Sequence, residues 1–108
     1  MNKTEVFNEQ LQQLSRFARA ISHPARAAIL QYLAATKTCI SGDISDHIPL
    51  SRSTVSQHLK ELRDIGLIHG DIDGLKINYC LCGSAIRKFQ DMMKEFLNTI
   101  ECDDGKCC

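Results

Sequence analysis

The sequence predicts a small, mainly α-helical domain that contains one β-hairpin. Three observations predict it. Apolar residues recur at helical spacing in several separate segments. Two strand-like runs are joined once, at Asp73-Gly74, by a typical two-residue hairpin signal. The length of 108 residues suits a single hydrophobic core rather than two.

The first two helices are predicted on either side of the Ser22-His23-Pro24 break. Over residues 4–21 apolar positions alternate at spacings of four and three, which gives one helical stripe. Pro24 ends this helix and suits the first turn of the next, which is expected over about 24–35. The inward residues predicted are Phe7, Leu11, Leu14, Ala18 and Ile21 in the first helix and Ile29, Leu30 and Leu33 in the second.

A short third helix and a longer fourth helix are predicted next. The third is expected over about 41–48 and is stopped by Pro49. In the fourth, Ser51 is a favourable N-cap and Gly66 a favourable residue just past the C-terminus. Its inward row is Val55, Leu59 and Leu62.

The C-terminal part is predicted to hold the hairpin, a last helix and a tail. The hairpin covers residues 67–82, and the last helix runs from about Ser84 to Ile100. Residues 1–101 are therefore expected to form the folded domain, and residues 102–108 a cysteine-rich tail.

This order of elements is that of a winged helix-turn-helix. The first and last helices carry more apolar residues than so small a core needs, so we expect them to pack against a second copy of the chain. The residues predicted in this dimer interface are Phe7, Leu11, Leu14, Phe89, Met93 and Phe96.

Composition excludes several classes of protein. With 44% apolar and 24% charged residues the chain is globular rather than disordered. No apolar run approaches the roughly 18 residues of a membrane span, and the polar N-terminus has no signal-peptide segment, so a cytoplasmic location is expected. The net charge is zero, but residues 1–38 carry five basic and two acidic side chains. A neutral total does not exclude DNA binding when basic groups gather on one face.

The outer face of the fourth helix predicts DNA reading. Its N-terminal half carries short or amide-tipped side chains where Glu and Lys would be usual on a solvated surface. Gln57 can pair bidentately with adenine, and Ser and Thr can reach base edges. Arg52 and Lys60 stand where phosphates would flank a major groove. The predicted DNA-binding residues are Ser51, Arg52, Ser53, Thr54, Ser56, Gln57, His58 and Lys60 on the helix and Lys76 on the hairpin.

Three stretches together, HPARAAILQYL, SRSTVSQHLKELRDIGLI and INYCLC, resemble the ArsR/SmtB family of metal- and metalloid-responsive repressors. The resemblance spans roughly residues 17–82. It implies a homodimer that binds an imperfect palindrome in double-stranded DNA and leaves it when an inducer binds. It also implies a dimer interface formed by the first and last helices.

The cysteines indicate the inducer. The arsenic site common in the family uses Cys-x-Cys-Asp, but the corresponding TCISGDI keeps only Cys39. The last helix, 84–101, has no His for the family's zinc site. Three thiols instead lie within seven residues at Cys102, Cys107 and Cys108, here called the tail cysteines. Three thiolates suit As(III), Sb(III) or another thiophilic ion as a regulatory ligand. Cys39 could join this site, and no cofactor is expected for folding.

Two alternatives to a metal-responsive repressor remain. Cys39 and a tail cysteine could instead form a disulfide or polysulfide, which would make the repressor a redox or sulfide sensor. An enzyme is not expected, because neither Cys80/Cys82 nor the terminal pair is predicted to open a helix after a strand, where a low-pKa nucleophile is typical. Cys80 and Cys82 are predicted on one strand face, with a packing role.

Overall fold

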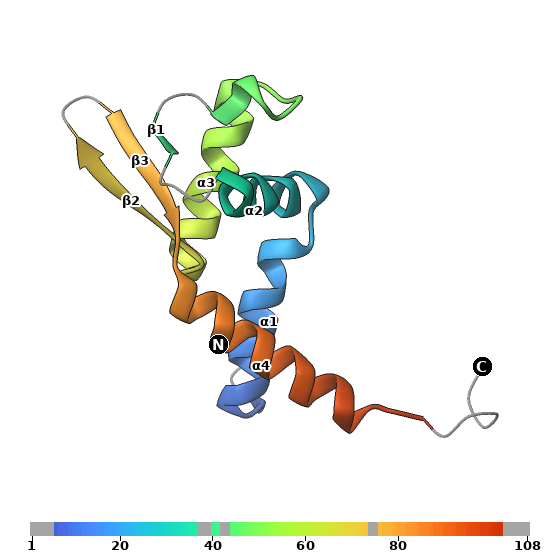
Figure 1. The fold of residues 1–108 in the computed structure, drawn as a ribbon. Helices are drawn as coiled ribbons and strands as arrows, with labels where there is room; N and C mark the ends of the chain where they lie inside the picture. The colour runs from blue at the N-terminus through green and yellow to red at the C-terminus, as the bar shows by residue number, and fades with distance from the viewer. Residues whose placement is uncertain (1–5, 37–39, 42–43, 74–75, 103–108) are drawn as a thin grey trace.

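The computed structural model describes residues 6–36, 40–41, 44–73 and 76–102, and the predicted fold class is confirmed. Four α-helices and a three-stranded antiparallel sheet make up this part of the chain (Figure 1). None of the helices in these ranges is both long and apolar enough to span a lipid bilayer. The elements are α1 Glu9–Ala18, α2 Pro24–Thr36, β1 Ile40–Ser41, α3 Arg52–Ile65, β2 Ile68–Asp73, β3 Lys76–Leu81 and α4 Gly83–Thr99, with 3-10 turns at Arg19–Ile21 and Ile44–Asp46.

Helix α1 is shorter than the stripe predicted. It begins after Asn8, whose side chain accepts a hydrogen bond from the backbone N–H of Leu11 at 2.8 Å and so caps the helix. A start at residue 4 is therefore wrong, because Phe7 precedes the cap. Ile21 is exposed, whereas Phe17 is buried. Phe17 lies outside the predicted stripe.

Helix α2 follows the prediction closely. It begins at Pro24, and the imidazole Nδ1 of His23 accepts a hydrogen bond from the N–H of Ala25 at 3.0 Å. Ile29 and Leu33 are buried, as predicted, and Leu30 is half-buried.

The predicted third helix over 41–48 is wrong. Ser41 belongs instead to the short strand β1, which pairs with β3, and Ile44–Asp46 forms a single 3-10 turn. Two factors, both unfavourable to a helix, explain the difference. The outer edge of β3 offers unpaired backbone groups to any nearby extended segment, and eight residues rich in Ser, Asp and Gly have little helix propensity.

Helix α3 has the termini and the inward row that the sequence predicts. Ser51 is the N-cap, and Gly66 ends the helix at φ 99°, in the left-handed region that glycine adopts without a Cβ clash. Val55, Leu59 and Leu62 are all buried. They join the core that α2, the 3-10 turn and β2 complete.

The hairpin is displaced by one residue from the predicted turn. Asp73 is the last residue of β2 and pairs with Lys76, so the connection is residues 74–75 rather than Asp73-Gly74. At Gly70 an added Cβ would lie 2.9 Å from the Cγ2 of Ile77 and 3.3 Å from the Tyr79 ring. Glycine at this position therefore allows the β3 side chains to lie across β2.

Helix α4 leaves the base of the hairpin and crosses α1 at the opposite end of the molecule from the hairpin tip (Figure 1). The backbone N–H of Cys82 donates to the carbonyl of Leu67 at 2.8 Å, which ties the start of α4 to the residue that follows α3. The Arg16 side chain donates to the carbonyl of Asp64 at 2.6 Å, which ties α1 to the same end of α3.

Candidate nucleic-acid interface

The face of α3 opposite its buried row is open to solvent. Because the three buried side chains occupy one side, the helical period turns the intervening residues outward. Thr54 and His58 are half-buried on the flanks, and the remaining predicted reading residues are exposed: Ser51, Arg52, Ser53, Ser56, Gln57 and Lys60.

The N-terminal end of α3 is ordered by hydroxyl groups. The Oγ of Ser51 accepts from the N–H of Thr54 at 3.3 Å and lies 2.9 Å from the Thr54 Oγ1. The Ser53 hydroxyl is 3.3 Å from the Ser51 Oγ. The partial positive charge of a helix N-terminus lies beside these hydroxyls, and such an end favours a phosphate.

The position of α3 is fixed by an ion pair with α2. Arg26 on α2 forms a salt bridge with Glu61 on α3, and its other terminal nitrogen donates to the Ser22 hydroxyl at 2.8 Å. The Arg26 side chain is largely covered, so the pair is less screened than a surface one. This salt bridge holds α3 on the flank that faces α2, here called the inner flank, and leaves the outer face of α3 open to solvent.

His58 lies on that inner flank. Its ring packs against the His23 ring with centroids 4.7 Å apart, and its Nδ1 is buried without a hydrogen-bond partner among the described residues. Burial, together with the nearby His23 and Arg26, lowers the pKa of His58, and Glu61 opposes this only in part. This placement favours a neutral imidazole, which gives a phosphate no charge to pair with. A DNA contact by His58 stays a prediction.

Of the remaining predicted site residues, some are described by the structure and others lie outside the described part of the chain. The backbone of Lys76 begins β3, but its side chain lies outside the described part, as do Cys39, Cys107 and Cys108. Cys102 is described and lies exposed just after α4, as a free thiol. Because Cys102 is the one tail cysteine among the described residues, the predicted ion site stays a prediction.

The predicted dimer residues lie on or beside the surface of α1 and α4. Phe7 and Leu11 are exposed, whereas Leu14 is buried within the chain. Phe89 is half-buried against Phe17, with ring centroids 5.5 Å apart. Met93 and Phe96 are also half-buried, and a groove of about 410 Å³ runs between α1 and α4.

Two cysteines differ from their predicted positions or states. Cys80 is buried on β3, as a packing role requires, but it is disulfide-bonded, which the sequence reasoning missed. Neither Cys82 nor Cys102 is its partner, because both are free thiols. Cys82 follows β3 and is the N-cap of α4, so the expectation that it would not open a helix after a strand is wrong. The Ser84 hydroxyl, and then the Ala85 backbone, lower the pKa of the Cys82 thiol.

Together, an amphipathic helix with a polar outer face, a preceding tight turn and a following hairpin define a winged helix-turn-helix DNA-binding regulator. A "Helix-turn-helix domain" family model matches residues 21–71. CmtR, an HTH-type transcriptional regulator of Mycobacterium tuberculosis, is 31% identical over 90 residues, which cover 83% of this chain and 75% of that protein. The "Arsenical resistance operon repressor" of Staphylococcus xylosus is 30% identical over 95 residues, 88% of this chain and 86% of the relative.

Solved structures agree on the fold. An ArsR-like transcriptional regulator from Rhodococcus superposes with a TM-score of 0.69 at 22% identity, over 82% of this chain and 83% of that one. The NMR structure of the "cadmium metal-sensor" CmtR superposes with a TM-score of 0.56 at 30% identity, over 88% and 95% of the two chains. The chain belongs to the ArsR/SmtB family. It is a DNA-binding transcriptional repressor and, as predicted, not an enzyme.

Proposed function

We propose that the repressor binds a palindromic operator as a homodimer and is released when a thiophilic ion, foremost As(III) or Sb(III), binds its tail cysteines. The observation that carries the DNA-binding part is the exposed, hydroxyl- and amide-rich outer face of α3, opposite a fully buried row. Side chains of this kind make close approach to base edges feasible, and the flanking Arg52 and Lys60 supply phosphate contacts.

The dimer is supported by the apolar surface that α1 and α4 leave uncovered. Phe7 is 59% exposed and Ile100 56%, and Leu11 and Leu97 are exposed beside them. Exposed large apolar side chains that gather on two helices of a small domain are typical of an interaction surface. A two-fold dimer through these helices would present two copies of α3 to major grooves about 34 Å apart.

The ligand is supported by the position of Cys102. This exposed free thiol lies three residues beyond the end of α4, the helix proposed for the dimer interface. An ion held there together with Cys107 and Cys108 would act on the relative position of the two protomers. To weaken operator binding about a hundredfold, the ion must favour the released state by about 2.7 kcal/mol. The cadmium and arsenical relatives support a soft ion, and soft ions prefer thiolate ligands.

The test measures release of the full-length repressor from its own promoter duplex by fluorescence anisotropy. We expect arsenite to release the wild type but not a chain in which the three tail cysteines are Ser, while both bind the duplex equally in its absence. The matched control is Cys82→Ser, which should respond like the wild type. A normal arsenite response of the tail variant would contradict the proposed ligand site without affecting the DNA-binding assignment.

A second function, release by thiol oxidation, is supported by one specific observation. Cys80 is disulfide-bonded in the structure, so at least one cysteine pair of this fold is close enough to oxidise. Titrating a disulfide such as oxidised glutathione against the DNA complex, separately from arsenite, distinguishes the two. Release by the oxidant at low concentration, with no effect of arsenite, would favour a redox-responsive repressor.

A further inference from the structure

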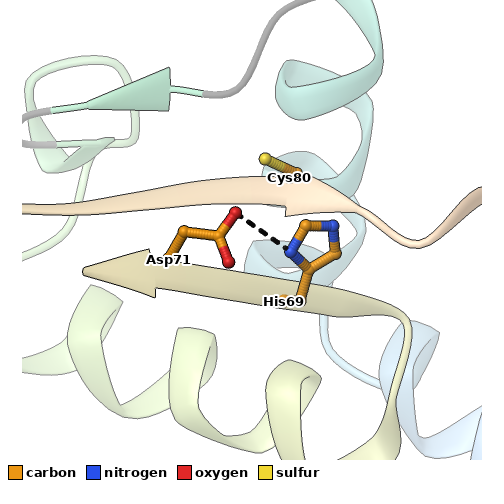
Figure 2. Close-up of side chains that lie close together, drawn as sticks. All are labelled: His69, Asp71 and Cys80. Carbon is orange, nitrogen blue, oxygen red and sulfur yellow. Dashed lines mark ion pairs between the residues drawn. The ribbon is translucent and has the colours of Figure 1, made fainter. Parts of the chain in front are cut away.

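A mixed cluster of metal-ligating side chains lies on the hairpin and includes no residue of α3 or the tail. The imidazole of His69 and the carboxylate of Asp71 project from β2, and Cys80 lies on β3 (Figure 2). One ligand atom from each residue falls within 4.8 Å of the other two. His69 pairs directly with Cys80 in the sheet register, and Asp71 follows two residues later on the same strand. Directly opposed residues and residues two apart share a sheet face.

The geometry points to a redox-gated site for a borderline-soft divalent cation, the class of Zn²⁺, Co²⁺ and Cd²⁺, formed by His69, Asp71 and the reduced Cys80. Imidazole nitrogen, carboxylate oxygen and thiolate sulfur are the three donors that proteins use for zinc. With metal–ligand distances of about 2.0–2.3 Å, tetrahedral ligand atoms lie about 3.3–3.7 Å apart. The Nδ1 of His69 and the Oδ2 of Asp71 are already 3.6 Å apart.

Solvent access and a further oxygen donor support the site. The side chains of His69 and Asp71 are 53% and 70% exposed, so a hydrated ion can reach them and both can rotate toward it. Asn78 pairs with Asp71 and stands two residues before Cys80, on the same face. Its Oδ1 is buried and accepts no hydrogen bond from the described residues. This amide oxygen, or water, is available to complete four-coordination.

Reduction is required because Cys80 is disulfide-bonded in this structure. A dithiol reductant supplies the two electrons. One of its thiolates attacks the disulfide, its second thiol closes the reductant's own disulfide, and the two protein sulfurs leave as thiols that carry the two protons. Binding of the cation then displaces the proton from the Cys80 thiol to solvent. The oxidised chain retains only His69 and Asp71, a weak pair of exposed ligands.

This site differs in chemistry from the one proposed on the tail. It offers one thiolate, whereas trivalent arsenic takes three sulfurs, so the hairpin should discriminate against arsenite and accept divalent ions. The inference therefore stands independently of the tail site. It adds a second input, in which the redox state of the thiols decides whether a divalent ion can link β2 to β3.

The test uses Co²⁺ as the probe, because cobalt reports sulfur ligation and tetrahedral geometry in its spectrum. The full-length chain with the three tail cysteines changed to Ser is reduced with a dithiol, freed of reductant without air, and titrated. We expect one equivalent bound, with a sulfur-to-cobalt charge-transfer band and the visible bands of tetrahedral cobalt. The same protein left oxidised should give no sulfur band.

Two variants in this background, each with a matched control, decide the assignment. Cys80→Ser should abolish the sulfur band, whereas Cys82→Ser should keep it. His69→Ala should weaken cobalt binding by about tenfold or more, whereas His47→Ala should not. The His69 substitution is on an exposed side chain, so it tests the site even if Cys80→Ser destabilises the buried β3 position. No cobalt bound by the reduced chain, an unchanged band in Cys80→Ser, or His69→Ala binding like His47→Ala would overturn the proposal.

Discussion

Replacing Gln57 with Ala isolates the base-reading role proposed for the outer face of α3. The side chain is exposed and makes no hydrogen bond with another described residue, so the substitution should change the free energy of unfolding by no more than about 0.5 kcal/mol. A bidentate contact to a base is worth about 1–3 kcal/mol. Per half-site, this corresponds to a loss of about 5- to 150-fold in operator affinity.

The assay is fluorescence anisotropy with the promoter duplex, at fixed salt, alongside a scrambled duplex of equal length. Operator affinity should fall while affinity for the scrambled duplex and the salt dependence stay the same, because Gln57 neutralises no phosphate. Gln31→Ala, at an exposed position on α2, is the matched control and should bind like the wild type. Unchanged discrimination between the two duplexes in Gln57→Ala would refute the reasoning.

Three further predictions concern stability and are measured by urea unfolding. Ser51→Ala removes the N-cap of α3 and should lower the free energy of unfolding by about 1 kcal/mol, whereas Ser56→Ala should not; equal losses would contradict the cap. Gly66→Ala places a Cβ at φ 99° and should cost about 1–2 kcal/mol, so unchanged stability would speak against the left-handed end. The pKa of His58 in the folded protein lies below its usual 6.5. As the pH falls below 6.5, the unfolded state therefore binds a proton before the folded state does. The free energy of unfolding should decrease over this range and level off below the folded-state pKa. His58→Gln should reduce this pH dependence, and an unchanged pH dependence in this variant would be inconsistent with burial of the His58 ring.

The long amphipathic elements could be predicted from the sequence because one signal dominates in each. In α3 the cap residues and the apolar period agree, so Ser51, Gly66 and the buried row were all identified. Helix α4 likewise begins and ends within a residue or so of the prediction. Where helix propensity, apolar spacing and capping residues all favour the same structure, tertiary contacts seldom change it.

The remaining features depend on contacts that a linear pattern does not carry. Strand β1 exists because β3 offers it an edge, and no local signal in residues 41–48 competes with that pairing. Phe17 is buried because α4 supplies the Phe89 ring beside it. The proximity of His69 and Cys80 depends on hairpin register, since the two residues are eleven apart in sequence. The turn was predicted one residue too early, which shifts the pairing by two residues and would place Asn78, rather than Cys80, opposite His69.

The attachment of α3 at its C-terminal end has a mechanical consequence. Arg16 holds the Asp64 carbonyl from α1, and Cys82 holds the Leu67 carbonyl at the start of α4. The residues proposed to read DNA lie at the far end of a 14-residue helix, roughly 21 Å away at 1.5 Å per residue. A tilt of about 10° at the anchored end would therefore carry Ser53 sideways by about 3.5 Å, more than the length of a hydrogen bond. A small rotation of α1 and α4 that carried α3 and its core contacts along as one rigid body would therefore be enough to move the outer face of α3 out of register with a groove.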